Sequence, residues 1–207
     1  MYAKFGKRLI DVLVSALALI ILSPLYLIIM AAIKIDSPGP VFFRQKRLGR
    51  NGTYFSIVKF RTMKTSAPSD VPTHLFQDPE LYITRLGRFL RKSSLDELPQ
   101  LMQILTGKMS IVGPRPALWS QYDLIEEREK FGVNSLRPGL TGWAQINGRD
   151  TISVEEKALL DAEYLSRLSF RFDLHCILLT VKKVIRGEGV AEGGRTGEKL
   201  LQGAIRE

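Results

Sequence analysis

The sequence predicts a mainly helical protein with a small β-hairpin and an N-terminal membrane helix. One uncharged apolar segment lies near the N-terminus, at residues 12–33. Two β-rich runs flank an Asn-Gly turn at residues 51–52, the strongest short hairpin signal in the chain. Beyond residue 80 the apolar residues recur with helical spacing. We therefore expect a membrane helix-hairpin at residues 1–36 and a globular domain at residues 37–207.

Composition limits the class of protein before any motif is considered. A chain of 207 residues fits one domain with an attached membrane element. Its 30 Lys and Arg against 21 Asp and Glu leave a formal charge of +9, which favours an anionic partner such as nucleic acid, lipid or nucleotide. The single Cys176 excludes an internal disulfide and, with only two histidines, leaves no zinc pattern.

The apolar segment is long enough to cross a bilayer, because its 22 residues would measure roughly 33 Å as a straight helix. Basic residues stand on both sides of it: Lys4, Lys7 and Arg8 before, and Lys34, Arg44, Lys46, Arg47 and Arg50 after. The positive-inside rule then draws both ends to the cytoplasmic side. Ser23 and Pro24 at the middle favour a bend, since proline removes a backbone hydrogen bond and serine can satisfy the freed carbonyl. We expect a re-entrant helix; a single span with a proline kink is the alternative.

The remaining elements follow in order along the chain. The hairpin is expected within residues 41–60, and a mobile loop rich in Pro, Ser and Thr at residues 65–80. Helical patterns occupy residues 81–92, 95–106, 117–131 and 153–165. The stretch Phe170–Arg186 is amphipathic and basic, so it either lies on a membrane surface as an interfacial helix or packs on the core with a solvated basic face.

Asp96 and Glu97 form an adjacent carboxylate pair in Ser-Ser-Leu-Asp-Glu-Leu-Pro-Gln. The run before them carries cations at Arg85, Arg88, Arg91 and Lys92. A carboxylate beside fixed cations suits phosphoryl chemistry, because the cations can hold a phosphate that would otherwise repel an anionic nucleophile. The bland alternative is a capping box between Ser94 and Glu97 at a helix start.

Two further segments suit phosphate and nucleotide binding. Prolines on both sides of Arg115 preset its backbone, which lowers the entropy lost when it grips a phosphate. Arg137 opens a glycine-rich stretch that ends at Arg149 and includes Gln145, and such a loop could approach a nucleotide sugar closely. An ordinary turn-rich connection is the alternative for this stretch. Lys59, Arg61 and Lys64 close the second expected strand and could face lipid phosphates instead of a substrate.

Taken together, these segments resemble the bacterial sugar transferase family, the small monotopic polyprenyl-phosphate phosphoglycosyl transferases that begin glycoconjugate and exopolysaccharide assembly. The resemblance runs nearly end to end and rests on motifs in the same order. These are Ser23-Pro24 in the apolar segment, Lys59-Phe60-Arg61-Thr62-Met63, Ser94-Leu95-Asp96-Glu97-Leu98-Pro99-Gln100, Val112-Gly113-Pro114-Arg115-Pro116 and Arg137-Pro138-Gly139-Leu140-Thr141-Gly142-Trp143.

The resemblance implies a two-step reaction. Asp96 attacks the sugar-bearing phosphate of a UDP-sugar, expected to carry an N-acetylated amino sugar, and expels UMP; undecaprenyl phosphate then takes the phosphosugar. Glu97 positions the metal or assists proton transfer, and Mg²⁺ with Asp96 and Glu97 as ligands screens the diphosphate. Arg91 and Arg115 bind phosphate, with Lys59 as a third cation.

The resemblance also places the protein at the cytoplasmic face of a bacterial inner membrane, with membrane lipids and downstream glycosyltransferases as further partners. No nucleic acid is expected, because the sequence has no recognition helix and no aromatic RNA motif. A membrane-tethered, non-catalytic scaffold or anionic-ligand-binding protein is the competing class, and it requires no reactive carboxylate at Asp96. Oligomeric state stays open at this stage.

Overall fold

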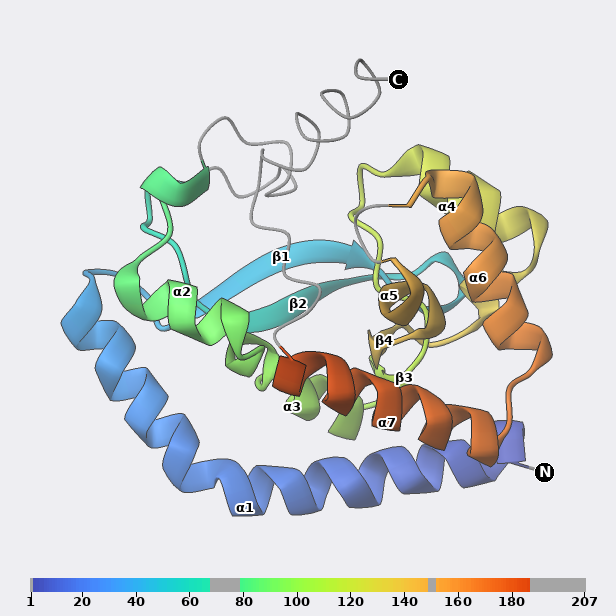
Figure 1. Ribbon diagram of the computed structural model, residues 1–207, viewed down its shortest axis with the longest axis horizontal. Helices are drawn as coiled ribbons and strands as arrows, with labels where there is room; N and C mark the ends of the chain where they lie inside the picture. Colours follow the sequence, from blue (N-terminus) through green and yellow to red (C-terminus); the bar gives the residue numbers. More distant parts are fainter. Residues whose placement is uncertain (1, 68–78, 149–151, 187–207) are drawn as a thin grey trace.

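The computed structural model describes residues 2–67, 79–148 and 152–186 and shows a helical globule resting on one long N-terminal helix (Figure 1). Its helices are α1 (Lys7–Asp36), α2 (Arg85–Lys92), α3 (Gln100–Leu105), α4 (Tyr122–Lys130), α5 (Trp143–Asn147), α6 (Val154–Ser166) and α7 (Phe170–Arg186). The strands β1 (Phe42–Leu48) and β2 (Tyr54–Phe60) pair antiparallel, and β3 (Ser110–Val112) and β4 (Gly139–Thr141) pair parallel. The mainly helical class with a small hairpin is confirmed.

The sequence did not predict the parallel pair β3 and β4, because each strand has only three residues and neither shows a run of alternating side chains. Three expected helices also begin later than predicted, and the pattern at 81–92 becomes helical only at Arg85. The pattern at 117–131 becomes helical only at Tyr122, since Leu118 forms a β-bridge with Arg47. The pattern at 95–106 splits into a 3₁₀ turn, Leu95–Glu97, and α3, with Pro99 between them lacking the N–H that a continuous helix requires.

Helix α1 runs along the base of the molecule and bends part-way along its length (Figure 1). Pro24 inside the helix cannot donate to the carbonyl of Ile20, and the hydroxyl of Ser23 donates to that same carbonyl at 2.8 Å. The predicted chemistry of the bend is therefore confirmed. Among the described residues, α1 is the one helix whose length and composition would allow it to cross a membrane.

Both halves of α1 pack on the same globule. Near its start, buried Asp11 accepts hydrogen bonds from the hydroxyl of Ser110 at 2.8 Å and the amide of Ile111 at 3.0 Å. Near its end, Ile29 and Ile33 share a buried cluster with Phe60 of β2. The helix is thus a packed element of the fold at both ends.

Opposite faces of α1 differ sharply in exposure. Large apolar side chains that point away from the globule are Leu9, Leu13, Val14, Leu17, Ile20, Ile21, Leu27, Ile28 and Ile35, all of them exposed. Their number on one element marks a surface made to contact something apolar, and a bilayer is the natural candidate for a helix of this length.

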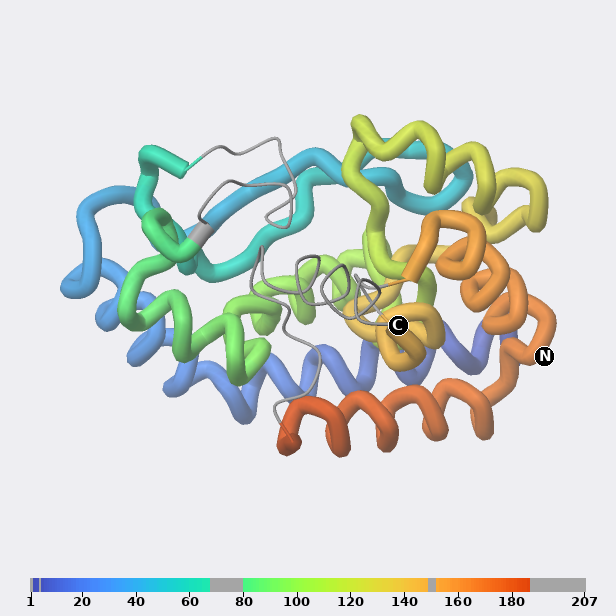
Figure 2. The backbone as a smooth tube through the Cα atoms, turned by 45° about the horizontal axis from the view of Figure 1, so that its top comes forward, coloured from blue at the N-terminus to red at the C-terminus, as the bar shows by residue number. Residues whose placement is uncertain are grey.

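Helix α7 lies along the same side of the molecule as α1 in both views (Figures 1 and 2). Phe172 and Cys176 on its inner face are buried in a cluster with Tyr164 of α6. Its outer face exposes the apolar residues Phe170, Leu174, Leu178, Val181 and Ile185 beside the exposed cations Arg171, Lys182 and Arg186. The helix packs on the core through its inner face, and its outward face is apolar as well as basic; an interfacial position on a membrane stays a prediction.

Candidate active site

The carboxylate pair lies in a tight turn between α2 and α3. Ser94 adopts the left-handed conformation, with φ of 57°, and the next three residues form the 3₁₀ turn Leu95–Glu97. Ser94 makes no side-chain capping hydrogen bond, so the predicted capping box is wrong. A non-glycine residue at positive φ is held there by its surroundings, and such residues concentrate at functional sites.

Glu97 is held by two cations from distant parts of the chain. Its Oε1 accepts from Nζ of Lys59, near the end of β2, at 2.6 Å and from Nη2 of Arg115 at 3.2 Å. The side chain of Glu97 is only 13% exposed and that of Lys59 17%. Glu97 therefore joins β2 to the loop that carries Arg115. Its carboxylate is engaged by these two cations and does not act as a helix cap.

Asp96 beside it is buried, at 8% exposure, and burial raises the pKa of its carboxyl above the usual range. The positive charges of Lys59, Arg91 and Arg115 act in the opposite direction and favour the ionised form, while Glu97 disfavours it. Burial likewise lowers the pKa of Lys59, against the attraction of Glu97. The site thus holds three cations around two carboxylates and has a net charge of +1 when all five are ionised.

The structure accordingly brings together the residues predicted to do chemistry and to bind phosphate. Asp96 and Glu97 lie in one turn. Lys59 of β2 and Arg115 of the loop after β3 contact Glu97, and Arg91 of α2 is near enough for its charge to act on Asp96. Arg61, two residues after Lys59, is different: it is buried and donates to the carbonyls of Ser37 and Pro38. Its charge supports the backbone after α1 and does not face lipid.

The predicted nucleotide-sugar loop is not an irregular loop, because its residues form β4 and α5. Nε of Arg137 donates to the carbonyl of Gly107 at 3.0 Å, beyond the end of α3, whereas Asp96 precedes the start of that helix. The six residues of α3 alone span about 9 Å, so Arg137 does not join the carboxylate pair. Gln145 lies in α5 and its Nε2 donates to the carbonyl of Leu140 at 3.4 Å. Arg149 lies outside the described residues.

Gln103 is a supporting residue that the sequence did not point to. It lies on α3, and its buried side chain accepts from the amide of Val58 at 3.0 Å and donates to the carbonyl of Ser56 at 2.6 Å. These two bonds hold β2, and with it Lys59, beside the turn that carries Asp96. A glutamine among apolar helix residues gives no signal for this role until the two elements are seen together.

The donor set suits a magnesium ion that arrives with its substrate. Among the described residues no group of three or more His, Cys, Asp or Glu side chains could form a complete protein cage for a metal. Mg²⁺ is commonly held by only one or two carboxylates, with water and substrate phosphates as its other ligands. The adjacent carboxylates of Asp96 and Glu97 fit that pattern.

Comparison with known proteins identifies the family of this chain. The sequence model of the bacterial sugar transferase family matches residues 2–187, which is nearly the whole chain. The chain belongs to the bacterial sugar transferase family. As a member of that family it is an enzyme, and the carboxylate pair with its three cations is the candidate active site.

Individual relatives give the same assignment. An uncharacterized sugar transferase, EpsL of Bacillus subtilis, is 42% identical over 96% of each chain. The exopolysaccharide production protein ExoY of Rhizobium meliloti is 38% identical over 89% of this chain and 87% of its own length. The UDP-glucose:undecaprenyl-phosphate glucose-1-phosphate transferase of Escherichia coli is 44% identical over 86% of this chain, which corresponds to 39% of that larger protein.

We predict that Glu97→Ala lowers stability by about 2 kcal/mol, because Lys59 and Arg115 would lose their shared carboxylate in a largely buried site. Thermal unfolding of the detergent-purified protein measures the effect. Glu80→Ala is the matched control, since the Glu80 and Arg88 side chains are 49% and 55% exposed and such pairs contribute about 0–1 kcal/mol. Equal effects of the two substitutions would contradict this account of Glu97.

Proposed function

We propose that this bacterial sugar transferase moves a sugar 1-phosphate from a UDP-sugar to undecaprenyl phosphate and releases UMP. The observation that carries the proposal is the buried carboxylate of Asp96 among Lys59, Arg91 and Arg115, beside Glu97. Both substrates are phosphate esters, and this site offers one nucleophile together with a surplus of fixed positive charge. The relatives named as UDP-glucose:undecaprenyl-phosphate glucose-1-phosphate transferases support the same pair of substrates.

In the first step a carboxylate oxygen of Asp96 attacks the phosphorus that carries the sugar. The bond between this phosphorus and the oxygen bridging the two phosphates breaks, and UMP leaves with that electron pair. Asp96 then carries the phosphosugar as an acyl phosphate. Lys59, Arg91 and Arg115 stabilise the charge that develops on the phosphate oxygens, and Glu97 keeps Lys59 and Arg115 in place.

In the second step an oxygen of undecaprenyl phosphate attacks the same phosphorus. The bond to Asp96 breaks, its carboxylate is regenerated, and undecaprenyl-diphospho-sugar leaves. Ionised phosphate is already nucleophilic, so the positive charge of the site has the same task as in the first step: it reduces repulsion between two anions. Bound Mg²⁺, held by Asp96 and Glu97, would supply further charge neutralisation of the diphosphate.

The membrane arrangement that suits this reaction is a re-entrant one, with the whole globule on the cytoplasmic face of the inner membrane. Lys7 near the start of α1 pairs with Asp173 of α7 at 2.6 Å, and Ile33 near its end packs on Phe60. Because both ends of α1 contact one globule, a straight span across the bilayer would have to separate these contacts. The bend at Pro24 instead lets the helix enter and return.

The sugar is the open part of the substrate. The N-acetylated amino sugar expected from the sequence and the glucose named for several relatives are the two candidates. A panel of UDP-sugars that contains UDP-glucose and UDP-N-acetylated amino sugars distinguishes them by the UMP each releases.

We predict that the detergent-purified protein releases UMP from one sugar of this panel in the presence of Mg²⁺ and undecaprenyl phosphate. Asp96→Asn should reduce the rate by at least about a thousandfold, because the carboxamide has no anionic oxygen to attack phosphorus. Intact mass after incubation with the UDP-sugar alone should show a phosphosugar adduct on the wild type and none on the variant. A fully active Asp96→Asn protein would exclude this mechanism and favour a non-catalytic role for the pair.

We predict that kcat/KM falls at acidic pH with a midpoint above the ordinary aspartate value of about 4, because burial raises the pKa of Asp96 and only its ionised form can attack. Activity is then present above the raised pKa and lost as the pH falls through it. Arg91→Gln should move this midpoint to still higher pH, since the charge of Arg91 lowers the pKa of Asp96. A midpoint that Arg91→Gln leaves in place would contradict the assignment of the acidic limb to Asp96.

We predict that both ends of α1 face the cytoplasm. Cysteines introduced as Phe5→Cys and Asn51→Cys, at exposed positions before α1 and after it, should react with a membrane-impermeant maleimide in inverted vesicles and stay unreactive in intact spheroplasts. Buried Cys176 serves as the background in the parent protein. Labelling of the two positions from opposite sides of the membrane would establish a single span instead.

A further inference from the structure

The loop that carries Arg115 is held through its backbone carbonyls. Pro114 and Pro116 have no N–H, so this stretch has few donors with which to form a ladder. The carbonyls instead accept one hydrogen bond each from four different groups. The amide of Gly139 donates to Pro114 at 2.8 Å, Nη1 of Arg128 to Arg115 at 2.9 Å, Nη1 of Arg47 to Pro116 at 3.0 Å, and the amide of Leu48 to Ala117 at 2.9 Å.

Arg128 is the donor that acts at Arg115 itself. It projects from α4 and is buried, at 3% exposure, where a guanidinium needs a compensating anion. That anion is Asp161 of α6, at 1% exposure, whose Oδ2 accepts from Nε of Arg128 at 2.9 Å and from Nη2 at 2.5 Å. The fork of two donors to one carboxylate fixes the plane of the guanidinium and so aims its third nitrogen, Nη1, at the carbonyl of Arg115.

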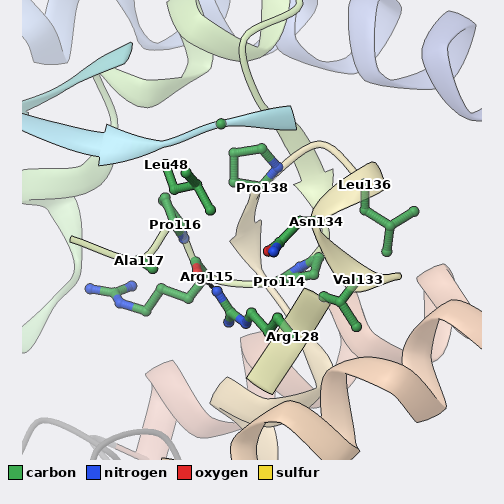
Figure 3. Close-up of a pocket in the computed structure, with 11 residues that line it drawn as sticks. Leu48, Pro114, Arg115, Pro116, Ala117, Arg128, Val133, Asn134, Leu136 and Pro138 are labelled. Carbon is green, nitrogen blue, oxygen red and sulfur yellow. Dashed lines mark hydrogen bonds between the residues drawn. The ribbon is translucent and has the colours of Figure 1, made fainter. Parts of the chain in front are cut away.

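The side chain of Arg115 leads away from Arg128, toward the active site. Figure 3 shows the guanidinium of Arg128 beside the backbone of Arg115, while the side chain of Arg115 extends in the opposite direction. At its far end Nη2 of Arg115 donates to Glu97, next to Asp96. One series of contacts thus runs from Asp161 through Arg128 to Arg115 and on to the carboxylate pair.

We propose that Arg128 and Asp161 are positioning residues for the transfer reaction, which set the backbone of Arg115 so that its guanidinium meets Glu97 and the substrate phosphate. Neither residue touches the reacting atoms. Their contribution is geometric: a displacement of about 1 Å in a phosphate-binding group can cost about a hundredfold in rate. The simpler alternative is that this buried ion pair only joins α4 to α6.

The two alternatives differ in what happens when Arg115 is absent. If the ion pair acts through Arg115, removal of the pair must lower kcat/KM only in proteins that contain Arg115. The double substitution Arg128→Leu with Asp161→Leu removes both charges together, because buried ion pairs can often be replaced by apolar residues without loss of stability, whereas removal of one partner leaves an unpaired buried charge. Arg115→Ala supplies the second arm of the cycle.

The experiment rests on the proposed function and measures UMP release for four proteins: wild type, the double Leu variant, Arg115→Ala, and the triple variant. We expect the double Leu variant to lose about ten- to a hundredfold in kcat/KM. In the Arg115→Ala background the same change should cost less than about twofold. Equal losses in both backgrounds would overturn the positioning role. Should the double Leu variant not fold, Arg128→Lys, which keeps the charge balance but cannot form the fork, replaces it in the cycle.

A matched control comes from the same helix. Glu127 and Lys130 form an exposed ion pair on α4, so Glu127→Gln with Lys130→Gln should leave kcat/KM within about twofold. A large loss of kcat/KM in this control would mean that any change of charge on α4 lowers activity. That result would overturn the specific role of Arg128.

A second measurement keeps the failure of this inference distinct from failure of the proposed function. Hydrogen exchange of a peptide spanning residues 112–118 needs no activity, and it should become faster in the double Leu variant but not in the Glu127 and Lys130 control. Exchange that stays unchanged would overturn the inference even in an active enzyme. If the wild type releases no UMP but exchange is faster in the double Leu variant, the proposed reaction is wrong. The role of the ion pair in fixing this loop is then still supported.

Discussion

The burial of Asp96 beside the partly buried carboxylate of Glu97 is the constraint on which the rest of this structure depends. Taking an ionised carboxylate out of water is costly unless cations and hydrogen bonds compensate it, and two neighbours repel each other as well. Lys59, Arg91 and Arg115 provide the compensation, and each comes from a different element. The hairpin, α2 and the loop after β3 must therefore converge on the turn at Asp96, and their packing is organised around it.

In the proposed mechanism, the positive charge that stabilises the carboxylate pair also prepares it for reaction. A site that held only the carboxylates would repel the proposed nucleotide diphosphate, and one that held only the cations would lack the proposed nucleophile. With three cations and two carboxylates the site has a small excess of positive charge, which suits substrates that bring negative charge with them. Stabilisation of the resting enzyme and attraction of substrate thus use the same side chains.

Helix α1 gives the molecule a long exposed apolar surface. It packs under the hairpin and α3 through its inner face, while its outer face is almost wholly apolar and exposed, and α7 adds a second outward apolar face along the same side. The family match covers α1 as well as the globule, so the helix is part of the shared sequence unit. The E. coli relative contains this unit within a larger protein, since the matched region is 39% of its length.

Several elements of the fold and the carboxylate pair follow from short stretches of the sequence. The sequence predicts the apolar segment with Ser23 and Pro24, the hairpin around Asn51-Gly52 and the motif containing Asp96 and Glu97, because each depends on residues close together in the chain. The bend of α1 was predictable for the same reason: the donor that proline lacks and the serine that replaces it are neighbours.

Contacts between residues far apart in the chain were decided only by the tertiary structure. Ser94 and Glu97 have the spacing of a capping box, yet the carboxylate of Glu97 binds Lys59 and Arg115, two partly buried cations from distant parts of the chain. The glycine-rich setting of Arg137 did not show its place in the fold, which is at the opposite end of α3 from Asp96. The roles of Gln103, Arg128 and Asp161 were invisible in the sequence, because a buried polar residue acquires its function from a partner that folding, not chain proximity, brings to it.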